Sequence, residues 1–255
     1  ASSFATPASQ ISTDTFGFFI LLSNRGLEPM TNVKVKATVE DVNTSNVLFA
    51  DSVLLASVDP GVIDSVVEFA SQFAPELPEG EYLLKYTVQS DSTDLRPEDN
   101  EQSSPFVVTT DIFSKENGAT TSTRTADDVA WTVGNYYVMA GGQFEAYKAT
   151  KAEFAFATDS TELNIEDVTA AVSLMKLNDD VPIDFEGFDT GEFPGNSVSL
   201  LGYANYEAPA GIENFQLQQV DIIDFETIEP GVLLEPGGRY FLTVSYDESV
   251  RKTNH

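Results

Sequence analysis

The chain contains no cysteine and only one histidine, His255, which is its last residue. The absence of cysteine excludes a disulfide framework, a thiol nucleophile, a thiolate zinc site and an iron–sulfur cluster. A lone histidine at the chain end leaves a Ser-His-Asp triad or a multi-histidine metal site without suitable residues. We therefore expect neither enzymatic activity nor a required cofactor.

Basic residues are also scarce, with 13 Lys and Arg against 41 Asp and Glu, which gives a net charge of -28 and a pI near 4.1. This charge repels nucleic-acid phosphates and anionic membranes, so we expect no nucleic-acid partner. A carboxylate pair for glycoside hydrolysis can always be chosen among 41 acidic residues, so such a pair carries no information. The acidity is spread along the whole chain and indicates a solvated, soluble surface.

Long apolar runs are missing as well. The stretch Phe16–Leu22 is too short to span a bilayer and is bounded by Asp14 and Asn24, so we expect no membrane insertion. A 42% hydrophobic content nevertheless supports packed cores. At roughly 100–150 residues per domain, the 255 residues predict about two domains.

The apolar residues that are present recur with a period of two. Such alternation is typical of strands with one buried and one wet face. Lys34 and Lys36 should accordingly face solvent. The residues expected on the buried faces of three such strands are Val35, Ala37 and Val39, then Tyr82, Leu84, Tyr86 and Val88, then Tyr240, Leu242, Val244 and Tyr246.

Turn signals separate these runs at the spacing of an antiparallel sandwich, as at Asp59-Pro60-Gly61 and Pro236-Gly237-Gly238. Ile165–Leu177 is the best helix candidate, but its β-branched residues suit a strand equally well. The stretch Ser114–Thr123 consists mostly of small and polar residues, which suits a linker. We therefore predict an all-β protein of two tandem antiparallel β-sandwich domains, with residues 1–112, a linker at 113–127 and residues 128–255.

The first domain carries turn motifs in a definite order between residues 14 and 110. They are Asn24-Arg25-Gly26, Asp59-Pro60-Gly61, Gly80-Glu81-Tyr82 and Glu98-Asp99-Asn100, followed by Pro105-Phe106-Val107-Val108. Each is common turn chemistry, but their order resembles CARDB, the bacterial cell-adhesion-related modules. One departure is Asp99-Asn100-Glu101, where that family often has a doubled asparagine. The resemblance implies an immunoglobulin-like sandwich.

The second domain opens on Trp131-Thr132-Val133-Gly134-Asn135-Tyr136-Tyr137 and ends on the strand Gly237–Tyr246. It looks like the β-sandwich regions, some of them jelly-rolls, that accompany such modules in large exported proteins of Bacteroidota, often type IX secretion cargo. The resemblance implies an extracellular or cell-surface location. It also implies partners among other modules of the same surface protein or among extracellular glycans and proteins.

Two acidic clusters are candidate calcium sites, because Ca²⁺ prefers several carboxylate oxygens held by a tight loop. One cluster holds Asp91, Asp94 and Asp99, together with Asn100, and the other holds Asp179, Asp180 and Asp184, with Asn178, Glu186 and Asp189 nearby. Neither has the spacing of an EF-hand. The alternative is that both are exposed loops in which Asp and Asn favour turns.

Aromatic residues are concentrated in the second domain, and Trp131, Tyr136 and Tyr137 are candidates for stacking on a sugar. The alternative is that Trp131 and one of the two tyrosines anchor the core, because neighbouring strand residues point to opposite faces. Tyr136 and Tyr137 cannot both be buried if only one face of their strand is covered.

We expect a non-catalytic structural or adhesion module, acting as a stalk or spacer of a bacterial surface protein. One alternative is a carbohydrate-binding accessory region of a secreted hydrolase. Another is a fragment of an enzyme whose active site lies elsewhere.

Overall fold

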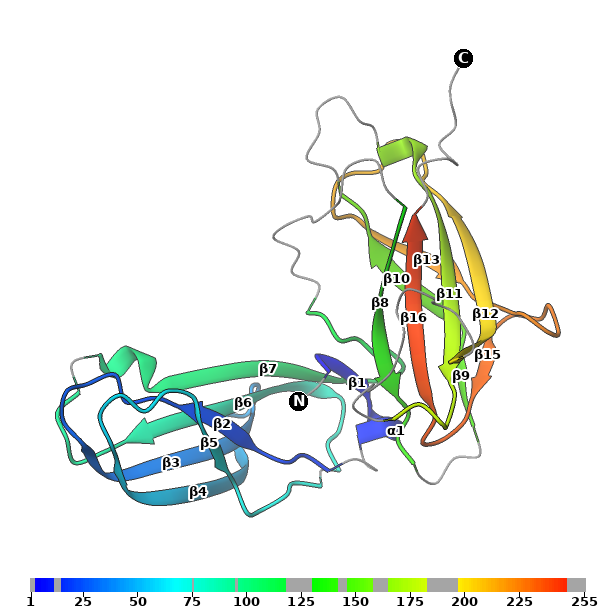
Figure 1. Ribbon diagram of the computed structural model, residues 1–255. Coiled ribbons are helices and arrows are strands. Elements are labelled where there is room, and N and C mark those ends of the chain that lie inside the picture. Colours follow the sequence, from blue (N-terminus) through cyan, green and yellow to red (C-terminus); the bar gives the residue numbers. More distant parts are fainter. Residues whose placement is uncertain are drawn as a thin grey trace. The chain divides into compact units, whose positions relative to one another are not determined.

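The computed structural model describes residues 3–11, 15–74, 76–94, 96–117, 130–141, 146–157, 165–182 and 197–246. Nearly all regular structure in them is β-strand arranged in several sheets (Figure 1), which confirms the predicted all-β sandwich class. The contacts between Cα atoms divide the chain into two compact units, residues 1–117 (unit 1) and 118–255 (unit 2). Of the predicted linker, residues 118–127 lie outside the described residues. Among the described residues, no helix is long and apolar enough to cross a membrane.

The described residues of unit 1 form seven strands, a short helix and a single 3-10 turn. They are β1 (Ala5–Pro7), α1 (Ala8–Ile11), β2 (Phe19–Leu22), β3 (Met30–Asp41), β4 (Val47–Val58), β5 (Ser65–Glu68), β6 (Gly80–Gln89), η1 (Pro97–Asp99) and β7 (Glu101–Thr109). Five strands form one sheet in the order β1-β7-β6-β3-β4, and β2 pairs with β5 in a second sheet. All neighbours are antiparallel except β1 and β7, which run parallel.

The core of unit 1 lies between these sheets and follows the alternation of β3 and β6. Lys34 and Lys36 are exposed, as predicted. A slip of one residue would bury both lysines, so the alternation fixes the register. Five of the predicted core residues are buried, and two at the far end of β6, Tyr86 and Val88, are only partly covered. The buried ones are Val35, Ala37, Val39, Tyr82 and Leu84.

Asp51 of β4 ties the segment after β5 to the five-stranded sheet. Its Oδ2 accepts a hydrogen bond from the Ser71 backbone N–H at 3.1 Å, and its Oδ1 accepts one from the Ser52 N–H at 2.7 Å. Hydrogen bonds from the Ser71 side chain and from the Ser52 backbone hold the pKa of this carboxyl below its ordinary value.

Replacing Asp51 by asparagine should therefore weaken unit 1 in a pH-dependent way. A folded-state pKa below the unfolded value near 3.9 gives stability that is present above pH ~4 and lost as the pH falls through the folded pKa. The expected loss at pH 7 is about 0.5 kcal/mol, because water screens this surface site. Urea unfolding followed by circular dichroism should show the difference at pH 7 and not below pH ~3. Exposed Asp59→Asn is the control, and a difference that persists in acid would contradict the assignment.

Unit 2 has nine strands and a 3-10 turn within its described residues. They are β8 (Trp131–Val138), β9 (Tyr147–Ala149), β10 (Lys151–Ala155), η2 (Ile165–Asp167), β11 (Thr169–Leu177), β12 (Val198–Glu207), β13 (Leu217–Asp221), β14 (Ile223–Asp224), β15 (Val232–Leu234) and β16 (Arg239–Tyr246). One sheet has the order β14-β12-β11-β16-β8, and β10 pairs with β13 and β9 with β15. The segment Ile165–Leu177, which the sequence left open, is a 3-10 turn followed by a strand.

The five-stranded sheet of unit 2 is covered on both faces, which the alternation in β16 did not predict. Tyr240 is buried on the predicted face, but Thr243 is buried on the opposite face. That second face carries an apolar cluster of its own, which comprises Met175, Leu177, Val181 and Val198 with Tyr136 and Phe241 packed against it. The turn at Asn178 is fastened there, since Arg239 Nη2 donates to the Asn178 carbonyl at 2.8 Å.

Both units contain a Gly-x-Tyr motif at the start of an inner strand of the sheet. The Tyr82 hydroxyl donates to the Pro78 carbonyl at 2.8 Å, and the Tyr240 hydroxyl accepts from the Glu235 N–H at 2.7 Å. Each ring lies over the glycine two positions earlier, and each tyrosine is at most 2% exposed. Anchoring a buried tyrosine to backbone a few residues upstream is the tyrosine-corner arrangement of immunoglobulin-like sandwiches.

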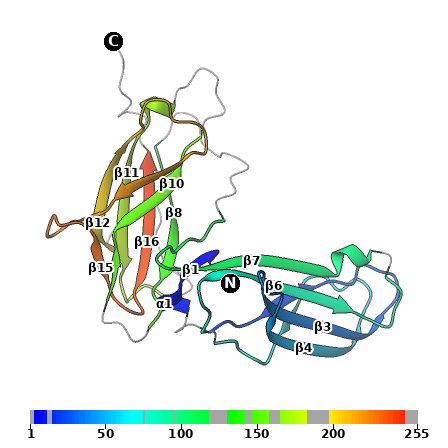
Figure 2. The ribbon, with the colours of Figure 1, turned by 180° about the vertical axis from the view of Figure 1, so that it is seen from behind.

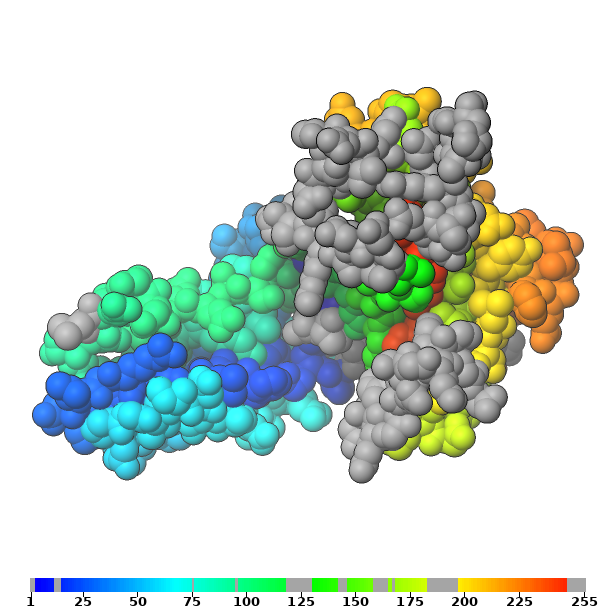
Figure 3. All heavy atoms as spheres, turned by 45° about the horizontal axis from the view of Figure 1, so that its top comes forward, coloured from blue at the N-terminus to red at the C-terminus, as the bar shows by residue number. Residues whose placement is uncertain are grey.

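Each unit also contains a turn of the same type. Asp41 Oδ1 accepts from the N–H groups of the second and third residues after it, and Asp224 Oδ1 does the same. The fifth residue of each turn has a positive φ, 58° at Ser45 and 60° at Ile228. In unit 2 this turn projects from the strands of that unit, in orange (Figures 1 and 3).

Ile228 is unfavourable at that position, because a β-branched residue with positive φ is strained. Its side chain is 61% exposed, so little packing is lost on truncation. Ile228→Gly should stabilise unit 2 by about 1 kcal/mol. Urea denaturation followed by Trp131 fluorescence would measure this. Ser45→Gly in unit 1 is the comparison, with a smaller gain expected, and a loss of stability in Ile228→Gly would contradict the strain.

Candidate functional site

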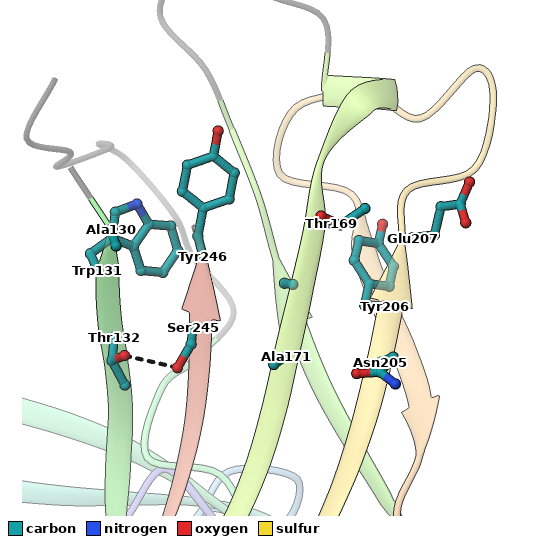
Figure 4. A pocket seen from close by; sticks show the side chains of 11 residues that line it. Ala130, Trp131, Thr132, Thr169, Ala171, Asn205, Tyr206, Glu207, Ser245 and Tyr246 are labelled. Carbon is teal, nitrogen blue, oxygen red and sulfur yellow. Dashed lines mark hydrogen bonds between the residues drawn. The ribbon is translucent and has the colours of Figure 1, made fainter. Parts of the chain in front are cut away.

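A pocket of about 700 Å³ opens at one end of unit 2, where β8, β11, β12 and β16 lie side by side (Figure 4). Trp131, Tyr206 and Tyr246 contribute its aromatic wall. A hydrogen bond of 2.8 Å between the hydroxyls of Thr132 and Ser245 joins β8 to β16 beside it. A pocket of this size, apolar with a few polar groups, is within the range of small-molecule sites.

The aromatic wall continues into the core of unit 2. The Trp131 ring centroid lies 5.6 Å from that of Tyr246 and 6.2 Å from that of Phe156. Tyr206 stacks on Phe156 at 5.7 Å and meets Phe154 edge-on at 5.0 Å. Trp131 is therefore packed against the core of unit 2 and is also one of the residues that line the pocket.

Tyr206 is unusual because its buried hydroxyl has no hydrogen-bond partner, the one such side-chain atom among the described residues. Burial raises the pKa of this phenol. Leaving a buried hydroxyl unpaired costs roughly 1–3 kcal/mol. Because it is buried, this oxygen reaches no ligand in the pocket unless its surroundings open.

The other two aromatic candidates lie away from the pocket. Alternation along β8 places Tyr136 on the face opposite Trp131, where its ring lies 5.5 Å from that of Phe241. Tyr137 lies beside Tyr240 in the ladder. Both tyrosines are half-buried, because both faces of this sheet are covered. Tyr206 and Tyr246, which line the pocket beside Trp131, lie on strands that are far from Trp131 in the sequence. Only the pairing of these strands brings the three aromatic residues together, so the sequence alone could not identify Tyr206 and Tyr246 as pocket residues.

The first acidic cluster lies in the loop between β6 and β7, and Asp91 and Asp94 have different hydrogen-bond partners. Asp91 Oδ2 accepts from the Asn32 side chain at 2.5 Å. Asp94 accepts from the Arg96 N–H at 2.8 Å and from the Asn100 side chain at 2.7 Å. Asp99 is exposed in η1. Asp94 therefore closes its own turn, whereas Asp91 ties the loop to Asn32 of β3.

In the second cluster, Asp179 and Asp180 are exposed at the turn after β11, and Asp184 lies outside the described residues, as do Glu186 and Asp189. Among the described residues, no three Asp, Glu, His or Cys side chains form a group that could hold a metal ion. Calcium binding at either cluster stays a prediction, and the arrangement that the structure describes favours the loop interpretation.

We expect calcium and magnesium to act alike on stability at equal ionic strength, through general screening of a net charge of -28. A specific site would add about 2.7 kcal/mol at a hundredfold excess of calcium over its Kd. Thermal melts in millimolar chloride salts of both ions measure the difference. A calcium-specific rise in Tm that is lost in Asp94→Ala or Asp180→Ala would contradict this expectation.

No model of a known protein family matches the sequence, and no curated protein is significantly similar to it.

Proposed function

We propose that this chain is a non-catalytic structural segment of a bacterial extracellular or cell-surface protein, a stalk or spacer that carries tension in adhesion. The observation that carries this proposal is the parallel pairing of β1 with β7 in unit 1. These are the first and last strands in the described part of unit 1, so load drawn through the unit reaches this pair once the short antiparallel contact of Phe4 and Ala5 with Ser114 has opened.

Parallel pairing sets the direction of that load. Tension drawn through the chain pulls β1 backward and β7 forward along the same axis. The hydrogen bonds between Ala5–Pro7 and Val107–Thr109 are then sheared together and cannot open one after another. Forced unfolding depends on the unfolding rate, so a pair loaded in this way delays rupture.

β1 is also held along its second side. The backbone N–H groups of Phe4 and Ala5 donate to the Ser114 carbonyl at 2.9 and 3.0 Å, and the Ser114 N–H donates to the Ala5 carbonyl at 2.9 Å. Ala5 itself is 5% exposed. The short β1 is therefore fixed by neighbours on both sides.

Two further features support a structural role on a cell surface. The Gly-x-Tyr anchors and the motif order resemble immunoglobulin-like adhesion modules, which commonly stand in series. The acidic surface favours repulsion between neighbouring chains and keeps them soluble.

Single-molecule pulling on the full chain tests this proposal. Because the chain has no cysteine, two introduced cysteines give unique attachment points. Ser3→Cys with Asp111→Cys loads β1 and β7 in shear. Glu28→Cys with Asp59→Cys is the matched control, since it pulls on the open ends of β3 and β4, where Met30 pairs with Val58, and opens that ladder bond by bond.

We expect the first geometry to rupture at a clearly higher force than the second at the same loading rate. Equal or lower force in the shear geometry would exclude a load-bearing role for unit 1. Both variants should keep the wild-type melting curve, because the replaced residues are not in the core.

A carbohydrate-binding accessory role is the second candidate, and the pocket beside Trp131 favours it. The exposed parts of Trp131 and Tyr246 offer an apolar face to sugar C–H groups. Soluble glycans should then be retained by the protein and quench Trp131 fluorescence, and Tyr246→Ala should abolish both effects. Absence of retention across a glycan panel would exclude this role.

A further inference from the structure

β4 is an edge strand of the five-stranded sheet in unit 1, and its unpaired outer side forms an open margin of that sheet. It pairs with β3 on one side, and both ribbon views show it at the edge of the sheet (Figures 1 and 2). Natural proteins usually protect such edges with charges, prolines or bulges, or keep them short, because free N–H and C=O groups invite another strand. β4 is twelve residues long.

Apart from one bulge near its start, where Val47 and Phe49 pair with the adjacent residues Glu40 and Val39, β4 lacks this protection. It contains no proline and no lysine, and its single charged residue is Asp51. Several of its apolar side chains are exposed, among them Leu54 at 70% and Val47 at 54%. The opposite margin of the same sheet is different. There β7 carries Glu101 and Pro105, and β1 covers its last residues.

The free backbone groups of β4 can be assigned from one hydrogen bond. The Ser52 N–H donates to the Asp51 side chain and therefore points away from β3. Since backbone direction alternates along a strand, Leu54 and Ala56 also direct their N–H and C=O groups to the open margin.

Two contacts bound this free stretch. Asp51 joins Ser71 at one end, and the Asn24 side chain donates to the Val58 carbonyl at the other, at 3.0 Å. Residues Val53–Ser57 between them have no backbone partner on the outer side among the described residues.

Positive charge lies beside this stretch. Lys34 pairs with Leu54 and Lys36 with Ser52 across the β3–β4 ladder, so both lysines stand on the outer face next to the margin. Neither makes an ion pair with a described residue, although the chain carries 41 acidic side chains. An added strand would lie two strand spacings from β3, about 10 Å. A lysine and a carboxylate that extend toward each other over the small Ser52 or Ala56 can cover that distance.

We propose that the β4 margin binds an extended acidic segment of a partner protein as an additional antiparallel strand. Main-chain hydrogen bonds to Leu54 and Ala56 would supply the pairing, and Lys34 and Lys36 would select outward-facing carboxylates. This interaction goes beyond the load-bearing role and does not depend on it.

Titration of the full chain with a capped peptide of about seven alternating valine and glutamate residues tests the proposal, with NMR of backbone amides as the readout. The peptide should shift the amides of Val53–Ser57 and bind at least tenfold more tightly than a matched valine–lysine peptide. Lys34→Glu with Lys36→Glu should reverse this preference. Weaker binding at higher salt is also expected.

Leu54→Pro is the edge control. It removes an outward N–H, which edge strands tolerate, and should abolish binding while leaving the melting curve unchanged. If Leu54→Pro fails to fold, Ala56→Pro serves the same purpose. Three results would overturn the proposal: no binding at millimolar peptide, equal binding of both peptides, or concentration-dependent shifts of the same amides without peptide, which would assign the margin to a second copy of the chain.

Discussion

Tyr82→Ala should unfold unit 1 at much lower denaturant while unit 2 stays folded. Tyr82 is 2% exposed, its ring stacks on Phe106 at 5.3 Å, and its hydroxyl anchors Pro78. Truncating a buried aromatic ring of this kind costs about 3–5 kcal/mol, a large share of the stability of a small domain.

The single tryptophan allows the units to be followed separately. Trp131 belongs to unit 2, so its fluorescence reports that unit, while circular dichroism reports both. Tyr82→Ala should move part of the circular dichroism transition and leave the fluorescence midpoint in place. Tyr240→Ala, which removes a residue 1% exposed, should move the fluorescence midpoint.

Tyr82→Phe is the matched control for the hydroxyl. It keeps the ring and removes only the bond to Pro78, so a loss of about 1 kcal/mol is expected. If Tyr82→Ala shifts the Trp131 transition as far as the circular dichroism transition, the two units unfold as one body and the predicted independent domains are wrong.

Gly202→Ala should destabilise unit 2 by about 2–3 kcal/mol, because an added Cβ would be crowded by the side chains of Val232 and Ile222. A Cβ at this position would meet a methyl group of Val232 and would lie 2.8 Å from Cγ2 of Ile222. Both neighbours are at most 2% exposed, so they belong to the packed core and move only at a cost. Urea denaturation followed by Trp131 fluorescence gives the loss directly.

Gly141→Ala is the control in the same unit, because a Cβ there meets no atom within 4 Å. It should be neutral or slightly stabilising, since alanine restricts the unfolded chain. Equal effects of the two substitutions would show that the cost comes from backbone entropy and not from crowding by Val232 and Ile222.

Local pattern was sufficient to predict much of unit 1. Alternation identified β3 and β6 and assigned Val35 and Lys36 to opposite faces, because a strand places successive side chains on opposite sides wherever it lies. The turn motifs marked the strand ends for a similar reason, since glycine and proline act through their own backbone dihedrals. These features depend on neighbours in sequence alone.

The candidate sites were less predictable. The density of acidic residues suggested cation binding, but a composition does not say whether Asp94 serves a metal or its own turn. Trp131 was identified as a candidate for stacking on a sugar or as a core anchor, while Tyr246 was assigned only to a strand face. Their proximity depends on β16 pairing with β8, a contact between the two ends of unit 2.

The amino-acid sequence by itself thus determined that the chain is all-β, where most strands run and which side chains of β3 turn inward. Only the tertiary structure decided that the sheet of unit 2 is covered on both faces, that the Tyr206 hydroxyl is left without a partner, that β1 runs parallel to β7, and that β4 lies at an open margin. The physical reason is the range of the interactions. Alternation and turn chemistry act over a few residues, whereas cover, pairing direction and edges are set by segments far apart in the chain.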